Sequence, residues 1–258
     1  MINIILCGCW GRMGNAVMRS VESCAVSDVE ARIVAGIDLP TPNEAPICKF
    51  PTYESIFDFP GKADVIIDFS HHSALPSLVK YATKTSTPLV VATTGHTEDE
   101  LALMKSASEK VAIFHSGNMS LGINLLIELA KLAEKTLGTA FDIEIVEKHH
   151  NKKLDAPSGT ALMIANAIKE NKTDAQYVYD RHNDRKAREQ NEIGIHSVRG
   201  GTIVGEHEVI FAGANETVTV SHSALSREIF AAGAVKAANY LSCKSAGLYN
   251  MSDLINGR

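Results

Sequence analysis

Residues 2–14, INIILCGCWGRMG, decide the fold of the N-terminal part of the chain. Residues 2–6 are apolar and mostly β-branched, which predicts a short buried strand. Gly8, Gly11 and Gly14 follow at once, and a helical pattern then runs to about Cys24. Glycines between a first strand and a first helix permit a tight turn, close approach of a pyrophosphate and close helix–strand packing. The stretch therefore predicts a dinucleotide-binding βα unit.

The spacing of these glycines is G-x-x-G-x-x-G, so a simple tight turn is the alternative interpretation. Asp38 favours the dinucleotide, because it ends the next apolar run, 31–37, where an acidic group hydrogen-bonds the adenosine ribose. A carboxylate there repels a 2′-phosphate, and Leu39 beside it is uncharged, although Arg12 offers a cation for a phosphate. We therefore expect NADH to serve at least as well as NADPH.

Short apolar runs alternate with helical patterns through residue 119. Strands are expected over 64–69, 89–92 and 111–114, and helices over 73–84 and 97–108, the latter with Thr97 as N-cap and Glu100 at N3. Strands separated by helices predict a parallel sheet whose strand carboxyl ends share one ligand-binding edge.

After Ser120 the pattern changes. Residues 121–137 predict an amphipathic helix with a core-facing stripe of Leu125, Leu126, Leu129, Leu132 and Ala133. A strand over 141–146 and a helix over 158–170 precede strands over 193–198, 203–211 and 217–222, with a hairpin turn at 213–215. The predicted fold class is α/β: a Rossmann-type dinucleotide-binding domain (1–119 and 228–258) plus an α+β domain with a mixed sheet (120–227) for substrate binding and oligomerisation. A final helix, about 227–241, is expected to pack back on the first domain.

The charge and composition of the chain argue against several classes of function. A net charge of −5 gives no overall case for binding nucleic acid or a membrane. Residues 172–191 hold several basic side chains, but interleaved acids favour a solvated loop over a nucleic-acid patch. The five cysteines predict reduced, mostly buried thiols. We expect a cytoplasmic protein, because no signal peptide or membrane span is apparent.

Residues 144–161, EIVEKHHNKKLDAPSGTA, carry the chemistry. His149 titrates near neutrality and suits a general acid, and Lys153 adds fixed positive charge. Ser158 is a plausible N-cap, so the amides of Gly159 and Thr160 point at an anion near a helix N-terminus. A metal site with Glu147 and an idle solvated loop are the alternatives. Two adjacent lysines argue against a metal, and none is expected.

The same stretch resembles the signature of the 4-hydroxy-tetrahydrodipicolinate (dihydrodipicolinate) reductase family, E-[IV]-x-E-x-H-x-x-x-K-x-D-x-P-S-G-T-A, at every specified position. The resemblance extends to the 8–14 loop, to 92–95, 116–119, 198–201 and 204–207, and to the C-terminal 247–249. It implies an NAD(P)H-dependent reduction that gives (S)-2,3,4,5-tetrahydrodipicolinate on the route to diaminopimelate and lysine, in a homotetramer joined through the second domain's sheet.

The resemblance also implies residue roles. His149 and Lys153 would donate protons. The small-molecule dicarboxylate substrate would be held by His150, Lys153, Ser158, Gly159 and Thr160. The cofactor would be lined by Gly8, Cys9, Trp10, Gly11, Arg12, Met13, Asp38, Ala92, Thr93, Thr94, Ser116, Gly117, Asn118 and Met119. One departure is Leu39, where some members carry an arginine for the 2′-phosphate. Another amino-acid-pathway dehydrogenase and an NAD-sensing regulator are the competing hypotheses; the chemical stretch disfavours both.

Overall fold

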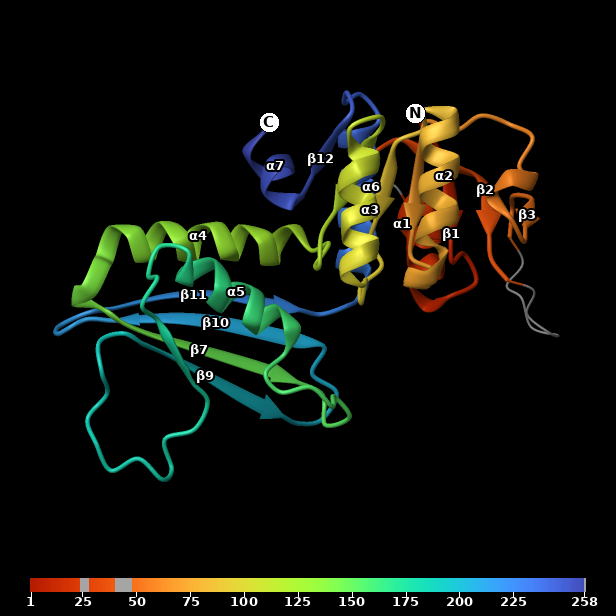
Figure 1. Cartoon of the computed structure of the whole chain (residues 1–258). Coiled ribbons are helices and arrows are strands. Elements are labelled where there is room, and N and C mark those ends of the chain that lie inside the picture. Colours follow the sequence, from red (N-terminus) through yellow and green to blue (C-terminus); the bar gives the residue numbers. More distant parts are fainter. Residues whose placement is uncertain (24–27, 40–47, 258) are drawn as a thin grey trace. The chain divides into compact units, whose positions relative to one another are not determined.

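A computed structural model of the chain describes residues 1–23, 28–39 and 48–257. By their contacts the residues divide into two compact units. Unit 1 comprises Met1–Leu121 and Arg227–Arg258, and unit 2 comprises Gly122–Ser226 (Figure 1). Cys24, where the first helix was expected to end, lies outside the described residues.

Unit 1 is a parallel sheet with the strand order β12-β6-β5-β4-β1-β2-β3. Its strands are β1 (Ile2–Cys7), β2 (Ala31–Ile37), β3 (Thr52–Tyr53), β4 (Val65–Asp68), β5 (Leu89–Val91), β6 (Ala112–His115) and β12 (Gly247–Tyr249). Its helices are α1 (Arg12–Ser23), α2 (Leu75–Thr85), α3 (Glu98–Ser108), α6 (Glu228–Leu241) and α7 (Met251–Asn256), with 3-10 turns η1 (Ile56–Asp58) and η2 (His72–Ala74).

Successive side chains of β1 point to opposite faces of this sheet, and each face has its own hydrophobic core. Ile4 and Leu6 belong to the cluster that α1 and α6 complete, whereas Ile5 and Cys7 belong to the cluster that α2 and α3 complete. A strand buried on both faces is continuously apolar, which explains the run at residues 2–6. The expected capping box of α3, between Thr97 and Glu100, is confirmed. The short strands β3 and β12 and helix α7 were not predicted, because strands of two or three residues and a helix of six residues are too short to show a clear periodicity.

Unit 2 is a mixed sheet with the order β11-β10-β7-β9-β8, in which β7 and β9 are parallel and β10 is antiparallel to both neighbours. Together with the parallel sheet of unit 1, it confirms the predicted fold class. Its strands are β7 (Asp142–His149), β8 (Gln176–Val178), β9 (Glu192–Arg199), β10 (Gly205–Ala212) and β11 (Thr217–Ala224), and its helices are α4 (Leu121–Leu137), α5 (Gly159–Lys169) and the 3-10 turn η3 (Gly138–Ala140).

Helices α4 and α5 pack on one face of the unit 2 sheet (Figure 1). The predicted stripe of α4 is wrong in part: Leu126 is buried, but Leu125, Leu129 and Leu132 are exposed. The core side is instead formed by Ile123, Leu126, Ile127 and Ala130. This helix is apolar on more than one side, so leucine spacing alone could not show which side faces the sheet.

Two further expectations need correction. Residues 172–191 are not only a solvated loop, since they contain β8, and two of their arginines form ion pairs: Arg181 with Glu192 at 2.5 Å and Arg188 with Asp142 at 2.7 Å. Of the cysteines in the described part, Cys7 and Cys9 are buried, but Cys243 is exposed. Within the described ranges, no helix combines the length and hydropathy of a membrane span.

Candidate functional site

The glycine loop opens onto a cavity of about 590 Å³ at the carboxyl edge of the unit 1 sheet. Gly8, Trp10, Gly11 and Asp38, four of the residues predicted to line the cofactor, are on its wall. Gly8 has φ +75°, and a Cβ there would lie 2.5 Å from the carbonyl oxygen of Phe69. Only glycine permits this conformation and this close approach, so the loop keeps its backbone open to a pyrophosphate.

Asp38 fixes the shape of this loop. One of its carboxylate oxygens accepts the Trp10 amide proton at 2.8 Å, and the other accepts the Leu39 amide proton at 2.9 Å. The carboxylate thus joins the end of β2 to the loop that follows β1. Each oxygen keeps a second lone pair for a hydroxyl donor, which suits a ribose diol.

The other predicted cofactor residues differ in what they can offer. Thr94 and Gly117 are exposed beyond the ends of β5 and β6. The Thr93 hydroxyl donates to buried Asp68 at 2.9 Å, and the Ser116 hydroxyl donates to the Asn118 carbonyl at 2.8 Å. Cys9, Ala92 and Met119 are packed in the core. Arg12 is exposed at the start of α1, and Met13 is partly buried against the core.

Sequence reasoning missed several residues of the cavity wall, among them Glu54, Phe69, Ser70 and His71. Ser70 and His71 follow β4, so their place after a parallel strand was the available signal. Glu54 follows the two-residue strand β3, which gave no such signal.

A second cluster lies in unit 2, where β7 and β9 end and α5 begins. The strand register places His149 beside Arg199, and Glu147 beside both Ser197 and His207. Ser158 is the N-cap of α5, as predicted: its hydroxyl accepts the Ala161 amide proton at 3.1 Å. The same hydroxyl is 3.1 Å from Nε2 of His207. Strand ends and a helix N-terminus therefore converge on one set of polar groups.

Glu147 is the fully buried centre of this cluster. Arg199 donates to its two carboxylate oxygens at 2.6 and 2.8 Å, and the Ser158 amide donates at 3.1 Å. Burial alone would raise the pKa of Glu147, but hydrogen bonds from Arg199, Ser197 and His149 outweigh it and lower the pKa to about 2. Glu147 is consequently ionised at neutral pH.

The carboxylate orients the candidate proton donor. Nδ1 of His149 is 2.5 Å from Glu147, so an ionised Glu147 holds the proton on Nδ1 and leaves Nε2 for another partner. Burial lowers the pKa of His149, although the hydrogen bond to Glu147 opposes the shift. Burial beside His149 lowers the pKa of His207 to about 4, so His207 is neutral at pH 7.

Lys153 and the first residue of α5 bind a carboxylate of the same chain, that of Asp155. Lys153 Nζ is 2.9 Å from the Asp155 carboxylate, to which the Gly159 amide also donates. The hydrogen bond to Lys153 is the largest cause lowering the pKa of Asp155. A Cβ on Gly159 would meet nothing within 4 Å, so the space beside it is open. The Asp155 carboxylate therefore occupies a position that has the charge and the hydrogen-bond donors suited to a carboxylate.

The remaining predicted substrate residues, His150 and Thr160, are partly buried at the two ends of this loop. In the described part of the chain, no group of three His, Cys, Asp or Glu side chains has the arrangement of a metal site. Sequence reasoning assigned no role to Arg199 or His207. The alternation of Glu147 and His149 on one strand face was a usable signal for that pair, whereas Arg199 joins them only through strand pairing.

Two family models cover most of the chain. "Dihydrodipicolinate reductase, N-terminus" matches residues 2–119, and "Dihydrodipicolinate reductase, C-terminus" matches residues 122–255. A 4-hydroxy-tetrahydrodipicolinate reductase from Caldanaerobacter subterraneus subsp. tengcongensis is 54% identical over 99% of this chain and 98% of its own. One from Clostridium novyi is 46% identical over 100% of both chains. The dipicolinate-bound dihydrodipicolinate reductase from Paenisporosarcina sp. TG-14 superposes with a TM-score of 0.80 at 25% identity, over 97% of each chain.

Proposed function

The chain belongs to the dihydrodipicolinate reductase family, and we propose that the two clusters described above carry out its reductase reaction. Its activity is that of a 4-hydroxy-tetrahydrodipicolinate reductase, an NAD(P)H-dependent oxidoreductase that forms (S)-2,3,4,5-tetrahydrodipicolinate in diaminopimelate and lysine biosynthesis. Unit 1 binds the nicotinamide dinucleotide, and unit 2 binds a small dicarboxylate. The dipicolinate bound to the Paenisporosarcina relative supports this class of substrate.

The pairing of His149 with a buried, arginine-bound Glu147 carries the assignment of roles. The dinucleotide supplies a hydride to a cyclic unsaturated dicarboxylate, with loss of water from the hydroxylated form. The electron-rich product then needs a proton at carbon. In the free protein, burial favours neutral His149. A bound dianion raises the pKa of His149, so the substrate itself favours the protonated donor.

Lys153 acts as the second proton donor and as fixed positive charge. Its ammonium group and the Gly159 amide hold one substrate carboxylate in place of Asp155. We assign Ser158, Thr160 and His150 to the same substrate site. The helix dipole of α5 adds to this attraction, because its N-terminus carries partial positive charge.

A coupled assay tests these roles. Dihydrodipicolinate synthase supplies the substrate, and NADH oxidation is followed for wild type, His149→Gln, Lys153→Ala and the matched control Lys152→Ala. Loss of a general acid lowers kcat by about 10²- to 10⁴-fold. We expect losses of this size for the first two variants and none for the exposed Lys152. Wild-type rates in His149→Gln would refute its role, and an inactive wild type would refute the function.

Cofactor choice is proposed to favour NADH at least as strongly as NADPH. Asp38 and Glu54 place two carboxylates on the cavity wall, and Leu39 lies there without a charge. Two carboxylates repel a 2′-phosphate. We expect Leu39→Arg to lower the Michaelis constant for NADPH and to leave that for NADH nearly unchanged. A wild-type constant for NADPH about ten-fold below that for NADH, a difference of about 1.4 kcal/mol, would contradict the proposal.

We also propose a cytoplasmic homotetramer joined through the unit 2 sheet. The sheet face opposite α4 and α5 carries Val146, Lys148, Glu206 and Ser221, none of which is fully buried. Light scattering coupled to size exclusion checks the assembly. A monomeric protein at micromolar concentration would contradict it.

A further inference from the structure

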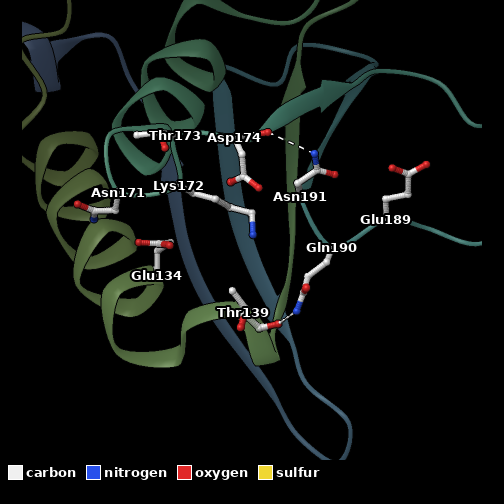
Figure 2. A pocket seen from close by; sticks show the side chains of 9 residues that line it. All are labelled: Glu134, Thr139, Asn171, Lys172, Thr173, Asp174, Glu189, Gln190 and Asn191. Carbon is white, nitrogen blue, oxygen red and sulfur yellow. Dashed lines mark hydrogen bonds between the residues drawn. The ribbon is translucent and has the colours of Figure 1, made fainter.

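A second cavity in unit 2, of about 470 Å³, lies at the C-terminal ends of α4 and α5 (Figure 2). Its wall includes Glu134 of α4, Thr139 of η3, Lys172 and Asp174 after α5, and Glu189 and Asn191 next to the start of β9. It is therefore near the amino ends of β7 and β9, whereas the reductase cluster lies at their carboxyl ends. Nothing in the proposed reduction uses these residues.

Lys172 is the unusual member of this wall. It is only 9% exposed, and its side chain extends into the middle of the ring of polar groups (Figure 2). Among the described residues, no carboxylate lies within ion-pair distance of its ammonium group. The ammonium group opens into the cavity and is not enclosed by protein, and its positive charge attracts anions there. Its orientation therefore suits an anionic group brought by a ligand.

The groups around Lys172 make the cavity unsuitable for a ligand that carries only negative charge. Glu189 is already paired with Lys186 at 2.7 Å, so Glu134 and Asp174 are the acids of the wall that remain beside its one lysine. One oxygen of Glu134 is buried with no hydrogen-bond partner in the described part of the chain. The C-terminal ends of α4 and α5 add partial negative charge, which attracts cations. A ligand that satisfies both signs carries one carboxylate and more than one positive group.

We propose that this cavity binds a small basic α-amino acid. Its carboxylate contacts Lys172, and its two ammonium groups contact Glu134 and Asp174. The volume falls within the usual range of small-ligand pockets, about 300–1,000 Å³.

The wall is held in place before any ligand arrives. The Gln190 side-chain amide donates to the Thr139 carbonyl at 2.6 Å, and the Asn191 side-chain amide donates to the Asp174 carbonyl at 3.3 Å (Figure 2). These bonds connect the segment before β9 to η3 and to the turn after α5. A preorganised wall loses less conformational entropy on binding.

Titration calorimetry of the full-length protein with L-lysine tests the proposal. Lys172→Met and Glu134→Gln each remove one predicted contact, and Lys135→Met changes an exposed lysine next to Glu134 as the control. 1,5-Diaminopentane lacks the carboxylate, and L-norleucine lacks the side-chain ammonium group. We expect L-lysine to bind wild type and Lys135→Met equally and Lys172→Met at least about ten-fold more weakly. Circular dichroism confirms that each variant is folded.

Three results would overturn the proposal. The first is no heat with L-lysine up to about 10 mM, which corresponds to an affinity too weak to be specific. The second is equal affinity for L-lysine and 1,5-diaminopentane, because the ligand carboxylate would then have no partner. The third is wild-type affinity in a folded Lys172→Met. None of these results depends on reductase turnover. A failure of this proposal can therefore be distinguished from a failure of the proposed function.

Discussion

Replacement of Arg199 by glutamine tests whether the buried ion pair organises the unit 2 site. Arg199 donates to both oxygens of fully buried Glu147, at 2.6 and 2.8 Å, and to the Asp155 carbonyl at 2.7 Å. Removing one partner of a buried ion pair costs about 3–5 kcal/mol. The fall in the pKa of Glu147 from 4.5 to about 2 independently corresponds to about 3 kcal/mol in favour of its ionised form. We therefore expect Arg199→Gln to lower the free energy of unfolding by about 3 kcal/mol.

Urea unfolding at pH 7.5, followed by circular dichroism, measures this loss. Glu147→Gln and the double variant complete a cycle, and Arg185→Gln is the control because Arg185 is exposed. Once Glu147 is neutral, loss of Arg199 leaves no buried charge, so we expect the double variant to recover at least about 1.5 kcal/mol relative to additivity. The control should change stability by less than about 0.5 kcal/mol. Additivity within about 0.5 kcal/mol, or a cost below about 1 kcal/mol for Arg199→Gln, would refute the reasoning.

Three further predictions concern pH, substrate affinity and the glycine loop. The pKa of His207 is lowered to about 4, so between pH 6.5 and 4 the unfolded chain takes up a proton that the folded chain does not, and acidification costs about 3 kcal/mol of stability. Thermal unfolding of His207→Gln at pH 7.5 and 4.5 should show less of this loss than wild type, and equal losses would contradict it. Asp155→Asn removes the carboxylate that Lys153 holds, so the Michaelis constant for the dicarboxylate should fall several-fold with little change in kcat; an unchanged constant would count against Asp155 as a competitor of the substrate. Gly14→Ala places a Cβ against the Gly8 carbonyl and the Cys9 backbone, so NADH binding, measured by fluorescence titration, should weaken at least about ten-fold; wild-type affinity would show that the loop can yield.

Much of the fold followed from local patterns. The run before Gly8 predicted a buried strand, and the structure buries it on both faces, with Ile4 and Ile5 in opposite cores. Thr97 and Ser158 were expected as N-caps and both are. Capping depends on a residue and its neighbours within one turn, so sequence contains the whole signal. The prediction for α4 was wrong in part, since Leu129 and Leu132 are exposed. The side of this helix that is buried depends on how it packs on the unit 2 sheet, which the sequence of the helix alone does not show.

The sequence by itself determined which candidate groups are available for the proposed chemistry. It identified the glycine loop, Asp38, the His149–Lys153 pair and the helix N-terminus at Ser158, because each is encoded within a short span of residues. Only the tertiary structure decided how these groups behave. Strand pairing brings Arg199 and His207 to Glu147 from β9 and β10. Burial and hydrogen bonding then set the protonation of Glu147 and His149, and both depend on segments about 50 residues away in the chain.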